Sequence, residues 1–153
     1  MIAERGGQYI EGWVFGFDFI DLSQTDVDDA KLRLLARLLE QLPGPALDQT
    51  RTIALDLSGT RITDVGVAFL QKCRIYRVDL SETKVTSKCV EYLPIHQMWY
   101  LGLSDTDVDD RAVDSLIETH KDSLLVLRLE NTKVTDKGFR RLEQSLPTAE
   151  IYR

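Results

Sequence analysis

The acidic run Asp105-Thr-Asp107-Val-Asp109-Asp110 offers carboxylate oxygens, the ligands that calcium prefers. Alternating aspartates also begin the twelve-residue calcium loop of the EF-hand. That loop needs glycine at its sixth position and glutamate at its twelfth, where this chain has Asp110 and Leu116. The run therefore does not predict a calcium site. Asp109 is better interpreted as a helix cap, with Val108 in the core.

Two cysteines and two histidines are the remaining soft metal ligands: Cys73, Cys89, His96 and His120. Their spacing matches no zinc site, so the sequence predicts no metal and no cofactor. Cys89 falls in a column of small residues. Cys73 and His96 stand at equivalent places 23 residues apart, which indicates structural positions. So few cysteines favour reduced thiols and a cytoplasmic protein.

Serines recur at one fixed place in the chain, directly after a Leu-x-Leu-like segment: Ser23, Ser58, Ser81 and Ser104. A catalytic serine needs one particular base and a water-excluding pocket, whereas a periodic column indicates repetition. The chain also lacks a nucleophile elbow, a phosphate loop and a dinucleotide fingerprint. We therefore expect a protein that is not an enzyme.

The serines belong to a pattern that appears five times. Its copies are Ile20–Val27, Leu55–Ile62, Val78–Val85, Leu101–Val108 and Leu127–Val134. Their threonines lie 35, 23, 23 and 26 residues apart, and Ala149-Glu150-Ile151 begins a sixth copy. Each copy continues into a polar pair such as Thr63-Asp64, then a small residue in four of five copies, then apolar residues three apart.

Each part of the pattern has a physical cause. Leu-x-Leu alternation predicts a strand with one buried face. The polar pair predicts a helix start, because its first side chain caps a free N–H and a following acid suits the positive helix end. Stacked strand–turn–helix units share one core. Pro43-Gly44-Pro45 predicts a loop after a long first helix that runs from Asp29 to about Leu42.

These segments resemble the leucine-rich-repeat family, and the match covers residues 17–151. The chain looks like the cysteine-containing subtype and short bacterial variants, with threonine at the usual Asn/Cys position. The resemblance implies an α/β right-handed solenoid of five strand-turn-helix repeats with a parallel concave sheet. It also implies that five threonines point inward and bond the turn backbone: Thr25, Thr60, Thr83, Thr106 and Thr132.

Alternation along the strands predicts which side chains line the concave face. The central column contains Asp21, Asp56, Asp79, Gly102, Arg128 and Glu150, and the column beside it contains Phe19, Ala54, Arg77, Tyr100 and Val126. We interpret the aspartates as an acidic half-face, with two aromatic anchors and two arginine contacts. The predicted partner-binding residues are Phe19, Asp21, Asp56, Arg77, Asp79, Tyr100 and Arg128. The alternative is that aspartate is simply the consensus residue of the repeat. Tyr76 and Trp99 either cap the core or extend this patch.

The family resemblance implies a non-catalytic protein-binding module that uses the concave face. The alternative is an assembly or scaffold subunit that docks through its ends or helical face. With 25 acidic against 19 basic residues, the net charge of −6 favours a protein partner with a basic patch over nucleic acid. No apolar stretch is long enough to cross a membrane. Residues 17–153 form the repeat domain, and residues 1–16 are either an N-terminal edge strand or an arm that orders on a partner.

Overall fold

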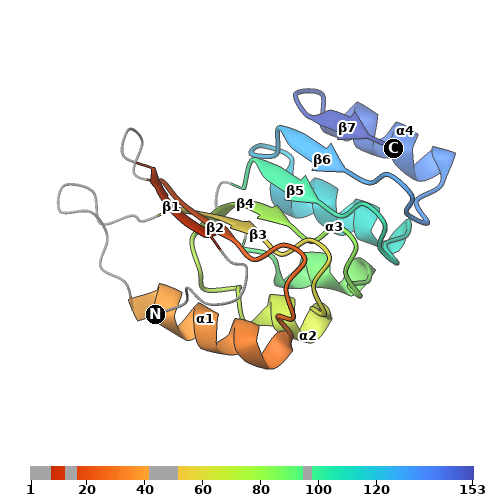
Figure 1. Ribbon diagram of the computed structural model, residues 1–153. Coiled ribbons are helices and arrows are strands. Elements are labelled where there is room, and N and C mark those ends of the chain that lie inside the picture. The colour runs from red at the N-terminus through yellow and green to blue at the C-terminus, as the bar shows by residue number, and fades with distance from the viewer. Residues whose placement is uncertain (1–7, 13–16, 42–51, 95–97) are drawn as a thin grey trace.

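The computed structural model describes residues 8–12, 17–41, 52–94 and 98–153, which form one sheet with helices on one side (Figure 1). The strands lie in sequence order across the sheet, and every strand from β2 to β7 runs parallel to its neighbours. The strands are β1 (Gln8–Gly12), β2 (Phe17–Asp21), β3 (Thr52–Asp56), β4 (Ile75–Asp79), β5 (Tyr100–Gly102), β6 (Val126–Arg128) and β7 (Glu150–Tyr152).

Helical segments alternate with the parallel strands, as the sequence predicts. They are α1 (Asp29–Gln41), α2 (Asp64–Ala68), the 3-10 helix η1 (Ser87–Tyr92), α3 (Arg111–His120) and α4 (Asp136–Ser145). The α/β alternation expected from the sequence is therefore confirmed. The loop expected at Pro43-Gly44-Pro45 lies outside the described residues.

The core lies between the sheet and the helices and is built from the inward strand positions. Leu55, Val78, Leu101 and Leu127 occupy one position on neighbouring strands and are fully buried. The first residue of the polar pair caps its helix: Thr63 accepts from the Val65 N–H at 3.2 Å. Because these aligned apolar residues pack against one another from repeat to repeat, the outward residues must share one surface on the far side of the sheet.

The turn after each strand is built the same way in every repeat. Each threonine hydroxyl donates to the carbonyl three residues earlier, for example from Thr60 to Leu57 at 2.6 Å. The others do the same at 2.6–2.7 Å, which confirms the predicted inward role: Thr25, Thr83, Thr106 and Thr132. The residue before each threonine has a positive φ: Gln24, Gly59, Glu82, Asp105 and Asn131.

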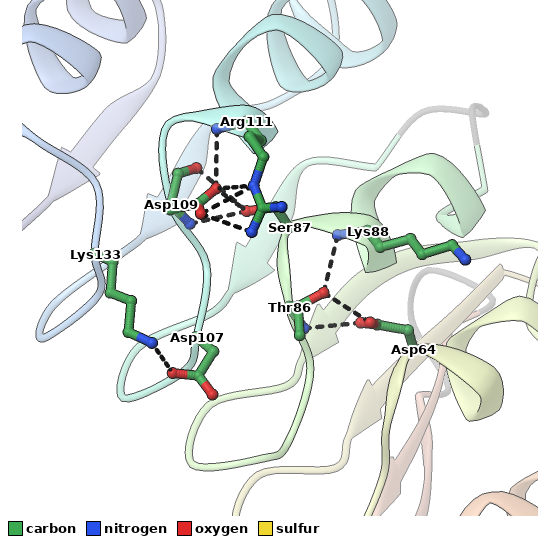
Figure 2. Close-up of polar contacts among 8 residues, drawn as sticks. All are labelled: Asp64, Thr86, Ser87, Lys88, Asp107, Asp109, Arg111 and Lys133. Carbon is green, nitrogen blue, oxygen red and sulfur yellow. Dashed lines mark hydrogen bonds and ion pairs between the residues drawn. The ribbon is translucent and has the colours of Figure 1, made fainter.

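A second set of polar contacts joins neighbouring repeats, and the sequence did not predict it. The Asp64 carboxylate accepts from both the N–H and the hydroxyl of Thr86, at 2.8 and 2.7 Å (Figure 2). Asp29 holds Thr63 in the same way, and Asp110 holds Thr135. We call each such pair a rung. These rungs fix the register of successive helix starts.

Serine replaces the aspartate in one repeat, and the rung is kept with the direction of its side-chain bond reversed. The Ser87 hydroxyl donates to the Asp109 carboxylate at 2.6 Å and accepts from the Asp109 N–H at 2.9 Å (Figure 2). Asp109 also accepts from the N–H of Arg111 at 3.0 Å, so the predicted capping bond is present, although the N-cap position of α3 is held by the next residue, Asp110. The side-chain contact with Arg111 lowers the pKa of Asp109.

The N-terminal strand β1 pairs antiparallel with β2 and forms the first edge of the sheet. Tyr9 lies opposite Ile20, and Ile10 lies opposite Phe19. The backbone of β1 thereby occupies the outer edge of β2, as the edge-strand alternative for the N-terminal segment requires. Residues 13–16 of that segment lie outside the described part of the chain.

Candidate functional site: the open sheet face

The sheet face that points away from the helices is the candidate functional site, and we call it the open sheet face. It carries the alternate strand residues that do not enter the core. One column contains Asp21, Asp56, Asp79, Gly102, Arg128 and Tyr152, and the other contains Phe19, Ala54, Arg77, Tyr100, Val126 and Glu150. The predicted place of Glu150 was therefore wrong. Ile151 pairs with Leu127, so Glu150 stands beside Val126 and Tyr152 beside Arg128.

Asp21 and Asp56 are partly exposed at the ends of β2 and β3, and each is tied to its own turn. Oδ1 of Asp56 accepts from the Ser58 N–H at 3.0 Å and from the Ser58 hydroxyl at 2.7 Å. Asp21 receives the same two bonds from Ser23, at 2.9 and 2.6 Å. These bonds give the repeated aspartate a structural use. They leave the second carboxylate oxygen of each side chain without a protein donor among the described residues.

Asp79 and Tyr100 are not the open contacts that the sequence predicted. Asp79 is 9% exposed and Tyr100 is 6% exposed. The Tyr100 hydroxyl donates to Oδ2 of Asp79 at 2.8 Å, and the Ser81 N–H donates to Oδ1 at 3.1 Å. Burial, with help from Asp79, raises the pKa of Tyr100. Both carboxylate oxygens of Asp79 therefore accept hydrogen bonds from within the protein, and Asp79 does not present an open carboxylate to a partner.

Gly102 makes room for this arrangement. A Cβ added at Gly102 would stand 2.4 Å from Oδ1 of Asp79, so any side chain there would displace the carboxylate. Asp79 can therefore lean across β5 toward the Tyr100 hydroxyl. The glycine that interrupts the column of aspartates is thus part of the contact between Asp79 and Tyr100.

The two predicted arginine contacts differ in their surroundings. The guanidinium carbon of half-buried Arg77 lies 3.6 Å from the centre of the Tyr100 ring, which explains why that ring is covered. Arg128 instead pairs with Glu130 at 2.6 Å, which lowers the pKa of Glu130 to about 2. Glu130 also accepts from the Ser104 hydroxyl at 2.5 Å.

Aromatic side chains flank this cluster at both ends. Phe19 is half-buried on β2. Tyr152, which sequence reasoning missed, is 45% exposed on β7, with the Arg128 guanidinium 5.8 Å from its ring centre. The signal that places Tyr152 is the alignment of Ile151 with the buried leucines. Tyr76 and Trp99 stack at 5.8 Å between ring centres and are both half-buried.

Tyr76 is placed by an irregularity in β4. Ile53 pairs with Ile75, whereas Ala54 pairs with Arg77, so Tyr76 is an extra residue in the ladder. A bulge of this kind turns a side chain away from the regular alternation. It brings Tyr76 beside Trp99, and it also puts Arg77 opposite Tyr100.

Other chemistry is sparse in the part of the chain that the structure describes. Those residues contain no group of three or more His, Cys, Asp or Glu that could hold a metal ion. None of their helices is both long and apolar enough to cross a membrane. Cys73 and Cys89 are buried, and burial raises the pKa of both thiols, that of Cys73 to about 11. Asp107 pairs with Lys133 at 2.5 Å, which is a surface contact between repeats (Figure 2).

The repeated strand, threonine turn and helix are consistent with a leucine-rich-repeat-like fold, and none of the described helices covers its open sheet face. No family model and no curated protein matches the chain. Among solved structures, a leucine-rich-repeat protein of Leptospira interrogans is similar, with 17% sequence identity and a TM-score of 0.47. The similarity covers 79% of this chain and 33% of that protein, so this chain spans about a third of its length.

Proposed function

We propose that this chain is a non-catalytic protein-binding module that uses its open sheet face, in a right-handed solenoid of five repeats. One observation carries the proposal. Six parallel strands present aligned side chains that none of the helices in the described part of the chain covers. Such a surface accepts an extended or convex partner without rearranging the fold.

The charges on this face support a partner with a basic patch. The partly exposed carboxylates of Asp21 and Asp56 have no cation paired with them among the described residues, and Glu150 adds another at β7. A cationic partner surface would offset the repulsion between the neighbouring aspartates, which is on the order of 1 kcal/mol. We infer a protein partner with a basic patch that contacts Asp21 and Asp56.

Charge reversal provides the test. We expect the double variant Asp21→Lys with Asp56→Lys to lose capture of the partner that the wild-type chain retains from cell extract. The matched control is Glu118→Lys with Glu143→Lys on the exposed sides of α3 and α4, which changes the net charge equally. Equal loss in both variants would show a general charge effect, and retained capture by the first would refute the proposal.

Asp79 is unsuitable for this experiment. Reversing its charge would break its bond to Tyr100 and place a lysine in a buried position, so lost capture could reflect lost stability. Asp21 is the appropriate companion to Asp56, because both side chains reach solvent. Each also accepts two bonds from a serine of its own turn, so lost capture is assigned to binding only if the double variant keeps the wild-type unfolding temperature.

A second candidate function, a scaffold subunit that docks through its helical side, is favoured by exposed leucines. On α1, Leu34 is 61% exposed and Leu38 is 53% exposed, one helical turn apart. Exposed apolar residues that cluster on one side favour association. Sizing chromatography at high concentration tests self-association through this surface: a larger species that Leu34→Glu dissociates supports it, and a monomer argues against it.

A further inference from the structure

The stacked pair of Arg77 and Tyr100 is a feature that the acidic character of the open sheet face does not explain. The guanidinium of Arg77 lies over the ring at 3.6 Å, within reach of a strong cation–π contact. No ion pair joins Arg77 to a carboxylate in the described part of the chain. Arg128, which lies on β6 at the other side of Tyr100 and opposite Gly102, is by contrast paired with Glu130.

The platform beneath Arg77 is held firmly. Tyr100 is fixed at its hydroxyl by Asp79, and Asp79 is fixed by the Ser81 N–H. The Trp99 ring meets the Tyr100 ring edge-on, with 6.1 Å between the ring centres. A guanidinium that stacks on a fixed ring keeps its N–H groups in the plane parallel to that ring, where they can donate to a ligand. Little side-chain freedom remains to be lost on binding.

We infer that the Arg77–Tyr100 pair is a carboxylate receptor at the centre of the open sheet face, which binds an Asp or Glu side chain of an extended protein segment. A planar guanidinium matches a carboxylate with two parallel hydrogen bonds. This inference rests on the proposed function, because it identifies one anchor of the partner that the face binds.

The position of Asp56 defines a second anchor of the same segment. Arg77 pairs with Ala54 on β3, and Asp56 lies two residues further along that strand. With about 4.8 Å between strands and about 6.6 Å for two residues, the two sites are about 8 Å apart. In an extended peptide, side chains two residues apart point the same way and are separated by about 6.6 Å. The segment therefore carries Lys or Arg two positions from its acidic residue.

Selection from a phage-displayed library of short random peptides tests this assignment. The wild-type chain is expected to enrich peptides with Asp or Glu two positions from Lys or Arg. Arg77→Gln should abolish the acidic preference and weaken the selected peptides about tenfold or more, while the basic preference remains. Arg77→Lys should also weaken them, because lysine keeps the charge but loses the stacked fork. Arg141→Gln on α4 is the matched control and should select as the wild type does.

The outcomes separate the two proposals. If the wild-type chain selects peptides without an acidic preference, or if Arg77→Gln keeps that preference, the carboxylate receptor is refuted while face binding stands. If the double variant Asp21→Lys with Asp56→Lys still binds every peptide that the wild-type chain selects, or if the wild-type chain selects none, the proposed function itself is refuted. If Arg77→Gln unfolds at the same temperature as the wild type, its changed selection reflects binding and not lost stability.

Discussion

Removal of the Asp64 carboxylate should destabilise the protein far more than removal of the equivalent carboxylate at Asp136. Both residues follow a threonine and occupy the first turn of a helix, α2 and α4, so their interactions with the helix ends are comparable. Only Asp64 also bridges to a following repeat, through two bonds to Thr86 at 2.8 and 2.7 Å. Asp136 is 84% exposed and lies 3.7 Å from Arg153.

The magnitude follows from these contacts. A hydrogen bond to a charged group contributes about 1.5–3 kcal/mol when buried, and the rung is only partly buried. Asp64→Ala leaves two donors of Thr86 without this acceptor, so we expect the free energy of unfolding to fall by about 2 kcal/mol. The midpoint temperature should fall by about 4–8 °C. Asp136→Ala should remain within about 0.5 kcal/mol of the wild type.

Urea unfolding followed by circular dichroism measures this difference. The fit is valid if both variants keep the wild-type slope, because a changed slope would indicate that the repeats no longer unfold together. Equal destabilisation by Asp64→Ala and Asp136→Ala would show that the rung contributes nothing beyond the helix start. The reasoning about register between repeats would then be refuted.

Three further predictions concern buried or strained groups. His120 is fully buried, and neither ring nitrogen has a hydrogen-bond partner among the described residues. Burial lowers the pKa of His120, so below about pH 6.5 the unfolded chain binds a proton that the folded chain does not bind. Stability should therefore fall by up to about 1.4 kcal/mol per pH unit as the pH drops. Urea unfolding between pH 5 and 7.5 should show a flatter profile for His120→Leu, and parallel profiles would contradict this. Glu82 has φ 58°, a left-handed backbone conformation that favours glycine, so Glu82→Gly should raise the free energy of unfolding by up to about 1 kcal/mol in thermal melts. Lys84→Gly should lower it, and a lower free energy of unfolding in both variants argues against strain at Glu82. Cys73 and Cys89 should resist a thiol reagent at pH 8 until urea is added, because both are buried with raised pKa values, and rapid labelling without urea would be inconsistent with the fold.

The sequence was sufficient where one repeat determines its own structure. The Leu-x-Leu alternation placed the strands, and the recurring threonine predicted the turn, because both depend on residues close together in the chain. The hydroxyl bonds of Thr60 and Thr106 formed as expected. The start of α1 at Asp29 likewise followed from a local capping signal.

The sequence was insufficient where two repeats meet. The burial of Tyr100 depends on Arg77 of the neighbouring strand, and that neighbour is set by the bulge at Tyr76. Asp64 looked like a helix-start residue, and nothing in its own repeat indicates the bond to Thr86. The place of Tyr152 was missed because the last copy is short, and its register could be read in more than one way.

Radical footprinting of the chain with its partner bound tests most directly which surface is used. Phe19 and Tyr152 report on the open sheet face, and Leu34 and Leu38 report on the helical side. Our account predicts that binding reduces oxidation of Phe19 and Tyr152 and leaves the two leucines unchanged. Protection of Leu34 and Leu38 with unchanged oxidation of Phe19 and Tyr152 would contradict it.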